Sequence, residues 1–178
     1  MRKRLDVLLV ERGLAESRAQ AQALVLAGRV RGYTKPGQQV ADDAELQVEA
    51  PPRFVSRGGE KLAHALAELS VSPAGKSCLD LGASTGGFTD CLLQHGAARV
   101  IALDVGYGQL HPRLRADDRV TVLERVNARE LPALPFAPEL ITCDVSFISA
   151  SKVLPPAVEQ AAPEWQALVR VNPQSKSG

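Results

Sequence analysis

The chain has 178 residues, a formal net charge of +1, and charged and hydrophobic fractions of 23% and 45%, as in an ordinary soluble protein. This length holds one large domain or a small and a medium one, and no stretch approaches the roughly 18 apolar residues of a membrane span. Three cysteines without metal-ligand spacing predict reduced, buried thiols, no metal site and a cytoplasmic protein.

Basic residues are concentrated near the N-terminus. Residues 2–35 contain eight Lys or Arg and three Asp or Glu, whereas residues 62–178 contain ten and twelve. The basic start resembles a signal peptide, but Asp6 and Glu11 interrupt the apolar run that follows. A basic segment before a mildly acidic one predicts a polyanion-binding arm on a globular domain. On charge alone, an ordinary solvated surface is the alternative.

Residues 1–50 predict a small α+β domain. An apolar repeat at helical spacing over residues 5–9 indicates a first helix. Ser17 and Gln20 have the spacing of a capping box, which predicts the start of a second helix that ends at Gly28. Short β segments are expected around residues 29–33 and 46–48.

The basic side chains of this domain are candidates for RNA binding, because Lys and Arg neutralise phosphates and release counterions. The strings Arg4-Leu5-Asp6, Ser17-Arg18 and Ala27-Gly28-Arg29-Val30 resemble the alpha-L RNA-binding motif of a small-subunit ribosomal protein and several RNA-modifying enzymes. A small helical cap without RNA is the alternative. With one residue from the next segment, the expected RNA-binding residues are Arg4, Arg18, Arg29, Arg31, Lys35 and Arg57.

A stiff connector is expected at residues 51–56, because it begins with two prolines. The second domain then covers residues 57–178. Its first helix opens with the string Ser56-Arg57-Gly58-Gly59-Glu60-Lys61-Leu62. The two glycines expose backbone N–H groups and Arg57 and Lys61 add positive charge, which together suit an anion. Ordinary helix capping explains the same string equally well.

From residue 73 onward, strands alternate with helical segments. Apolar runs predict five strands, and an apolar repeat predicts a helix over about 149–161. This rhythm predicts an α/β fold with a parallel sheet covered on both faces. The expected strands are Ser77–Leu81, Arg99–Leu103, Val120–Leu123, Leu140–Cys143 and Ala167–Val171.

A glycine-rich turn follows the first of these strands. Its pattern is acid-x-Gly-x-x-x-Gly-Gly, which matches neither the dinucleotide fingerprint nor the phosphate loop. The pattern resembles motif I of S-adenosylmethionine-dependent methyltransferases, and a tight turn without a ligand is the alternative. The expected cofactor-binding residues here are Asp80, Gly82, Ser84, Thr85, Gly86, Gly87 and Phe88.

Two further acids end strands on the same side of the predicted sheet. Asp104 comes 24 residues after Asp80, where a doubly wound fold places the acid that binds a ribose diol. That geometry serves S-adenosylmethionine or NAD, and Val105 adjoins it. Asp144 closes the fourth strand, and Asn127 is a weaker candidate for the adenine edge. Each acid can also be an ordinary strand-end residue.

Taken together, these motifs and the string Cys143-Asp144-Val145-Ser146-Phe147-Ile148-Ser149 resemble the TlyA family. The resemblance implies an alpha-L RNA-binding domain and a Rossmann-like, FtsJ-type domain with about five of the usual seven strands. It implies S-adenosylmethionine-dependent methylation of ribose 2′-hydroxyls in ribosomal RNA. The family relies on a Lys-Asp-Lys-Glu tetrad, whose first two members match Lys61 and Asp144 as catalytic residues.

The chain departs from the family in its last residues. The family has Lys-Pro-Gln-Phe-Glu where this chain has Asn172-Pro173-Gln174-Ser175-Lys176, so Asn172 stands at the second catalytic lysine. The chain is therefore expected to be a C-terminally shortened member. An alternative function follows: a module that binds RNA and cofactor but has little catalysis. A membrane-lytic toxin is not favoured, because no amphipathic or spanning segment is predicted.

The strand expected at 167–171 has a consequence for association. Without the two further strands of the family, it forms an apolar edge of the sheet. Exposed edge strands pair with other chains. The sequence therefore predicts self-association, and a monodisperse monomer at high concentration in light scattering would contradict this prediction.

Overall fold

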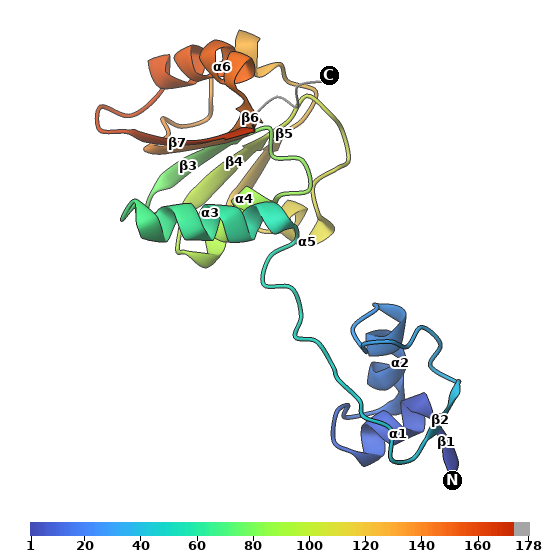
Figure 1. Cartoon of the computed structure of the whole chain (residues 1–178). Coiled ribbons are helices and arrows are strands. Elements are labelled where there is room, and N and C mark those ends of the chain that lie inside the picture. The colour runs from blue at the N-terminus through green and yellow to red at the C-terminus, as the bar shows by residue number, and fades with distance from the viewer. Residues whose placement is uncertain (173–178) are drawn as a thin grey trace, which may run out of the picture. The chain divides into compact units, whose positions relative to one another are not determined.

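The computed structural model describes residues 1–172, except for the side chains of residues 147 and 172. The motif residues at 173–176 lie outside this range. The chain divides into two compact units, Met1–Pro52 and Arg53–Gly178 (Figure 1). None of the described helices is both long enough and apolar enough to cross a bilayer.

The first unit is built on two helices. The apolar spacing predicted α1 (Leu5–Glu11), and the capping box predicted the start of α2 (Arg18–Leu26). The unit also contains an antiparallel pair, β1 (Arg2–Arg4) with β2 (Gln39–Ala41), which was not predicted. Three-residue strands are too short to show a clear period of two. The expected β segments beyond α2 contribute only an isolated bridge between Val30 and Val48.

A single buried carboxylate ties the helices of this unit together. The Asp6 side chain is fully buried and accepts hydrogen bonds from the Arg4 guanidinium at 2.9 and 3.0 Å, from Arg18 at 3.3 Å and from Gln22 at 2.9 Å. These bonds, led by that of Arg4, hold the pKa of Asp6 well below its usual range. The predicted capping bond is present, with the Ser17 hydroxyl accepting from the backbone N–H of Gln20 at 3.1 Å.

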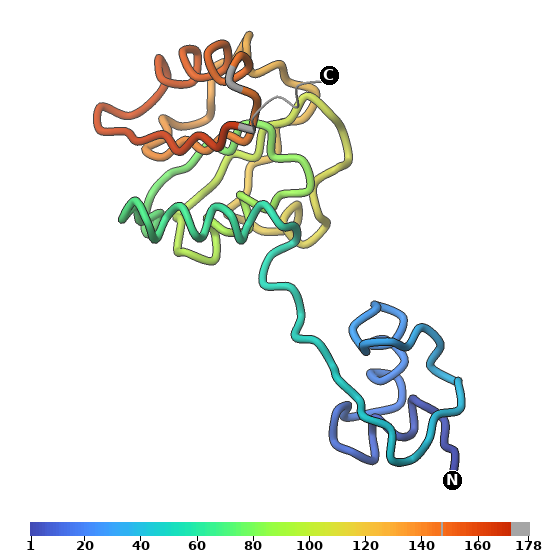
Figure 2. The backbone as a smooth tube through the Cα atoms, in the orientation of Figure 1, coloured from blue at the N-terminus to red at the C-terminus, as the bar shows by residue number. Residues whose placement is uncertain are grey.

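The second unit contains a five-stranded sheet in which every neighbouring pair is parallel, as predicted (Figure 1). The strand order is β5-β4-β3-β6-β7, so the chain reverses direction across the sheet at β3. Figure 2 traces this path from α3 in teal to β7 in red. The strands are β3 (Ser77–Leu81), β4 (Arg99–Leu103), β5 (Val120–Leu123), β6 (Leu140–Ser146) and β7 (Gln166–Asn172).

Helices cover both faces of this sheet. One face is covered by α3 (Arg57–Glu68), α4 (Gly87–Gln94) and the short α5 (Pro112–Arg115), and the other by α6 (Phe147–Glu159) and the 3-10 helix η1 (Ala128–Glu130) (Figure 1). Alternation along β3 supplies both cores: Cys78 packs on the α3–α4 side and Leu79 on the α6 side. The three cysteines are buried and free, and burial raises the pKa of each thiol to about 12.

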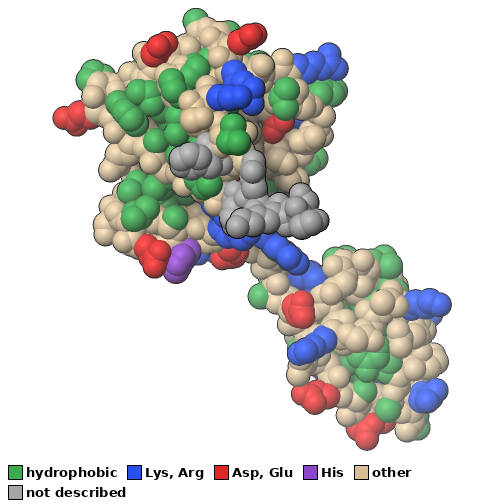
Figure 3. Space-filling model, turned by 45° about the horizontal axis from the view of Figure 1, so that its top comes forward, with side chains coloured by type: hydrophobic (Ala, Val, Ile, Leu, Met, Phe, Trp, Pro, Cys, Tyr) green, Lys and Arg blue, Asp and Glu red, His purple; other side chains and the backbone are tan. Residues whose placement is uncertain are grey.

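Strand β7 is the outer strand of this sheet among the described residues, since it pairs only with β6. Its Val171 is 42% exposed, and Leu69 at the end of α3 is 62% exposed. Figure 3 shows hydrophobic side chains gathered on one face of this unit. Self-association through residues 167–171 stays a prediction.

The glycines at the start of α3 serve close packing. A Cβ added at Gly59 would overlap the Cβ and Cγ of the buried Phe54, and one added at Gly87 would overlap the Ser56 hydroxyl. A Cβ at Gly58 would make ordinary van der Waals contacts, at 3.5 Å from the edge of the Phe88 ring and 3.5 Å from the Ser56 hydroxyl. The glycines therefore let the first turns of α3 and α4 approach each other, and this close approach requires no anion.

This packing predicts opposite outcomes for adjacent glycines. Gly59→Ala is expected to lower the free energy of unfolding by about 1–3 kcal/mol, because the added methyl group overpacks the core. Gly58→Ala is expected to be neutral or slightly stabilising, because the residue is helical and has room for a methyl group. Urea unfolding of the two variants measures this difference, and equal midpoints would contradict the packing argument.

Candidate active site

Three acids lie at the carboxyl ends of neighbouring strands. Asp80 is the fourth residue of β3, Asp104 directly follows β4, and Asp144 lies on β6 one residue beyond the position paired with Leu81. In open α/β sheets, ligands bind at this edge, where the strand order reverses. The sequence prediction that these acids share one edge of the sheet is consistent with this register.

A polar cavity of about 240 Å³ opens at this edge. Among the predicted cofactor residues that line it, Asp80 and Asp144 supply carboxylates, and Ser84 and Thr85 supply hydroxyls. An added Cβ at Gly82 would point into open space, and its φ of +74° favours glycine. The complete lining is Ser56, Gly58, Asp80, Gly82, Ala83, Ser84, Thr85, Gly87, Phe88, Asp144 and Arg170.

The Asp104 carboxylate holds the glycine-rich turn in shape. One oxygen accepts from the backbone N–H of Ser84 at 2.7 Å, and the other accepts from that of Gly106 at 2.8 Å. Ser84 has a φ of +53°, which is unusual for a residue other than glycine. Asp104 itself lines a separate small cavity of about 10 Å³.

Three other predicted cofactor residues lie outside the polar cavity's lining. Gly86 caps α4 with a φ of +104°, and an added Cβ there would overlap Leu114. Val105 is 74% exposed. The Asn127 side chain caps η1 by accepting from the backbone N–H of Arg129 at 3.0 Å. Each of these residues therefore has a local structural role or an exposed position, and their contact with a cofactor stays a prediction.

Asp80 is the most strongly perturbed of the acids. Its side chain is 1% exposed and accepts hydrogen bonds from the hydroxyls of Thr89 at 2.7 Å and Thr142 at 3.2 Å. Burial raises the pKa of Asp80 to about 7, although these hydroxyls act in the opposite direction. A cation placed in the adjoining cavity would favour the ionised carboxylate.

The raised pKa predicts how stability depends on pH. The folded chain holds the Asp80 proton more tightly than the unfolded chain, so this stabilising contribution is complete below pH 3.8 and is lost as the pH rises through about 7. The loss amounts to roughly 4 kcal/mol if the whole shift applies. Asp80→Asn should therefore raise the melting temperature more at pH 8 than at pH 5. An equal change in melting temperature at both pH values would contradict the raised pKa of Asp80.

An ion pair that the sequence did not predict lies beside the polar cavity. The Arg170 guanidinium on β7 donates to the Asp144 carboxylate on β6 at 2.9 Å, between residues that are register partners. Arg170 interrupts the otherwise apolar run of residues 167–171, and this was the available signal. Its position across from Asp144 depends on the strand order, which the sequence pattern left open.

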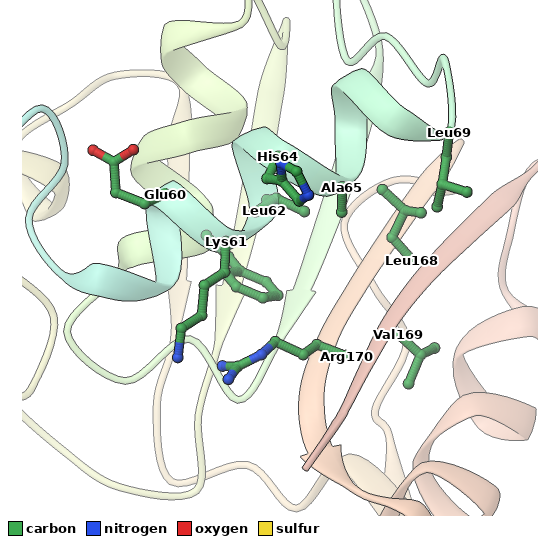
Figure 4. Close-up of a pocket in the computed structure, with 10 residues that line it drawn as sticks. Glu60, Lys61, Leu62, His64, Ala65, Leu69, Leu168, Val169 and Arg170 are labelled. Atoms are coloured by element: carbon green, nitrogen blue, oxygen red, sulfur yellow. The ribbon is translucent and has the colours of Figure 1, made fainter.

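Lys61 lies on the exposed side of α3 and lines a larger cavity, a groove of about 510 Å³ between α3 and β7. Its other lining residues are mostly apolar, and Arg170 lines this cavity as well as the polar one. The charged ends of Lys61 and Arg170 point toward one another, whereas Glu60 points away (Figure 4). Within residues 1–172, Lys61 has no ion-pair partner.

Two family patterns match this chain. The FtsJ-like methyltransferase family matches residues 54–174, and the S4 domain matches residues 3–31. The 16S/23S rRNA (cytidine-2′-O)-methyltransferase TlyA of Mycobacterium tuberculosis is 48% identical over 99% of this chain and 69% of the relative. The chain belongs to the TlyA family. The S4 match lies in the first unit, within the residues 2–50 for which the sequence predicted an alpha-L RNA-binding motif.

Other relatives of the TlyA-family chain agree with this assignment. YqxC of Bacillus subtilis is 47% identical over 99% of this chain and 66% of its own length, and Hemolysin A of Brachyspira hyodysenteriae is 46% identical over 85% and 66%. The chain thus spans about two thirds of the length of these curated relatives.

Solved structures support the fold. A protein from Streptococcus thermophilus described as a "putative hemolysin" has 42% sequence identity and a TM-score of 0.67, covering 99% of this chain and 68% of that one. A structure from Listeria monocytogenes described as a "putative S-adenosylmethionine dependent methyltransferase", with 17% identity and a TM-score of 0.53, shares the fold alone. Among the described residues of the TlyA-family chain, no group of three or more His, Cys, Asp or Glu could hold a metal ion.

The predicted RNA-binding residues of the S4 unit differ in whether their charged groups already contact other groups of the chain. Arg4 and Arg18 donate to the buried Asp6, so part of their charge is already neutralised. Arg29 donates to the Glu49 backbone carbonyl at 2.8 and 3.2 Å, which leaves its charge unpaired. Arg31 and Lys35 make no side-chain hydrogen bond or ion pair within residues 1–172. The last three are the better candidates to contact phosphates.

Proposed function

We propose that this chain transfers a methyl group from S-adenosylmethionine to a ribose 2′-hydroxyl of ribosomal RNA. The observation that carries the proposal is the polar cavity at the carboxyl edge of the sheet, lined by two carboxylates and a glycine-rich turn. Residues 1–50 serve as the RNA-binding domain, 51–56 as the linker and 57–178 as the methyltransferase domain. Ribosomal RNA as the substrate implies a cytoplasmic protein.

The residues of the cavity suit the charge of the cofactor. S-adenosylmethionine carries a sulfonium and an ammonium group. Asp144 supplies a carboxylate to the cavity, and a bound cation would favour the ionised form of Asp80, whose pKa burial raises to about 7. Asp104 would bind the ribose diol through the lone pairs that its two backbone hydrogen bonds leave unused. When bound, the cofactor supplies an electrophilic methyl group.

The acceptor hydroxyl needs positioning and a route for its proton. Lys61 is the candidate group for that role, because it lines the cavity next to the one that contains Asp144. Asp144 orients the neighbouring cations, as its 2.9 Å contact with Arg170 illustrates. A positioned acid or base typically contributes about 10²- to 10⁴-fold to a rate.

Asn172 is the specific observation that favours a second function. An amide has no basic nitrogen, so Asn172 cannot replace the second lysine of the family's tetrad as a base. A chain with the cofactor cavity and the S4 unit but without that lysine would bind RNA and S-adenosylmethionine and turn over slowly. The second candidate is therefore a binding module with little catalysis.

Labelled cofactor separates the two functions. The chain is incubated with tritiated S-adenosylmethionine and unmodified 16S or 23S rRNA transcripts, and cofactor binding is measured in parallel by calorimetry. Label in the RNA supports the enzyme. Cofactor and RNA binding without label supports the module, and absence of cofactor binding would overturn both functions.

A further inference from the structure

Two cations converge on the side of the proposed cofactor cavity. The Lys61 ammonium and the Arg170 guanidinium line the same groove between α3 and β7, and their charged ends point toward one another (Figure 4). Two like charges that line one groove repel each other, and an anion between them offsets this repulsion. Within residues 1–172, the only carboxylate at ion-pairing distance from either cation is that of Asp144, which contacts Arg170.

The ion pair with Asp144 leaves donors of Arg170 available. The ion pair uses one terminal nitrogen of Arg170, Nη1, at 2.9 Å from Oδ2 of Asp144. A guanidinium presents five N–H donors in a planar fork, so it can contact a carboxylate and a phosphate together. The Arg170 side chain is 36% exposed, which keeps those donors within reach of a ligand.

The position of Arg170 indicates which anion it meets. Arg170 is the residue, besides Phe88, that lines both the polar cavity and the groove containing Lys61. An anion held by both cations therefore lies next to the cavity where the methyl donor is proposed to bind. The RNA strand that carries the target ribose brings a phosphodiester close to this cavity.

We propose that Arg170 and Lys61 together hold a phosphodiester of the RNA beside the target ribose, with Asp144 fixing the orientation of Arg170. Arg170 is a positioning residue in this account. The inference rests on the proposed function, because it assumes an RNA substrate at this edge of the sheet. A structural role for Arg170, limited to neutralising Asp144, would give the residue no part in RNA binding.

The test compares Arg170→Gln, Arg170→Lys and Lys152→Gln in the full chain. Lys152 is exposed on α6, which covers the opposite face of the sheet, so its variant is a control for a lost positive charge. Affinity for an unmodified 16S rRNA transcript is measured over a series of salt concentrations, and thermal melting reports folding. Calorimetry with S-adenosylmethionine reports the cofactor site separately.

The expected result is a roughly tenfold weaker RNA affinity for Arg170→Gln, since a hydrogen-bonded charge is lost. Its salt dependence should also decrease by about 0.7, the slope of one phosphate contact on single-stranded RNA. Arg170→Lys should restore the slope, and Lys152→Gln should match the unaltered chain. An unchanged slope in a folded Arg170→Gln variant would overturn the proposal, as would a loss confined to cofactor affinity. If Arg170→Gln decreased the slope but the unaltered chain transferred no methyl group, the phosphate contact would be supported and only the proposed methyl transfer would be contradicted.

Discussion

Replacement of Asn172 by lysine is expected to increase the rate of methyl transfer to ribosomal RNA by about 10²- to 10⁴-fold, the usual contribution of a positioned acid or base. Asn172 is the last residue of β7, and its backbone pairs with Ser146 on the strand that carries Asp144. A lysine at this position would add a basic nitrogen on the strand that neighbours Asp144. Transfer of tritium from the cofactor to a 16S rRNA transcript measures the change.

The matched control is Asn172→Gln, which lengthens the side chain without adding a basic group. If the effect arises from proton transfer, this variant should be as slow as the unaltered chain. Equal rates for the lysine and glutamine variants would show that a basic group at position 172 has no part in catalysis. Cofactor affinity should be the same in all three chains, because the change concerns the acceptor's proton.

Replacement of Asp104 by alanine is expected to weaken S-adenosylmethionine binding by about 100-fold. Two hydrogen bonds from a ribose diol to an ionised carboxylate are worth about 1.5–3 kcal/mol each, and the lower end of that range for the pair corresponds to about this factor. The variant also loses the contacts that hold Ser84 and Gly106, which loosens the glycine-rich turn. Calorimetry measures the affinity without requiring turnover.

Asp118→Ala is the control for this experiment, because Asp118 is an exposed acid in the loop before β5. Its loss removes the same charge far from the proposed contacts, and the affinity should not change. If Asp104→Ala bound the cofactor as well as the unaltered chain while remaining folded, Asp104 would have no part in the cofactor site.

Much of the second unit could be predicted from local sequence. The first three strands, β3 to β5, begin and end at the predicted residues, because short apolar runs there are bounded by polar or glycine residues. Helix α6 begins two residues before its predicted start, where Ser146 accepts a capping bond from the backbone N–H of Ser149. The placement of Asp80, Asp104 and Asp144 at one edge followed from the parallel sheet alone.

Features that depend on contacts between distant residues were not predicted. The pairing of Arg170 with Asp144 requires the register of β6 and β7, and the engagement of Arg4 and Arg18 by Asp6 requires the packing of α1 against α2. The need for glycine at position 59 became clear only from the close approach of Phe54. In each case the sequence specified the residue type, whereas the partner came from the tertiary structure.

The most direct test of the proposed function is the identity of the methylated nucleoside. Unmodified 16S and 23S rRNA transcripts are incubated with the chain and labelled S-adenosylmethionine and are then digested to nucleosides. The nucleosides are separated by chromatography and identified by mass spectrometry. The proposed function predicts label in a 2′-O-methylated nucleoside, with its methyl group on the ribose fragment. Label on a base fragment, or no label from a chain that binds both RNA and cofactor, would contradict it.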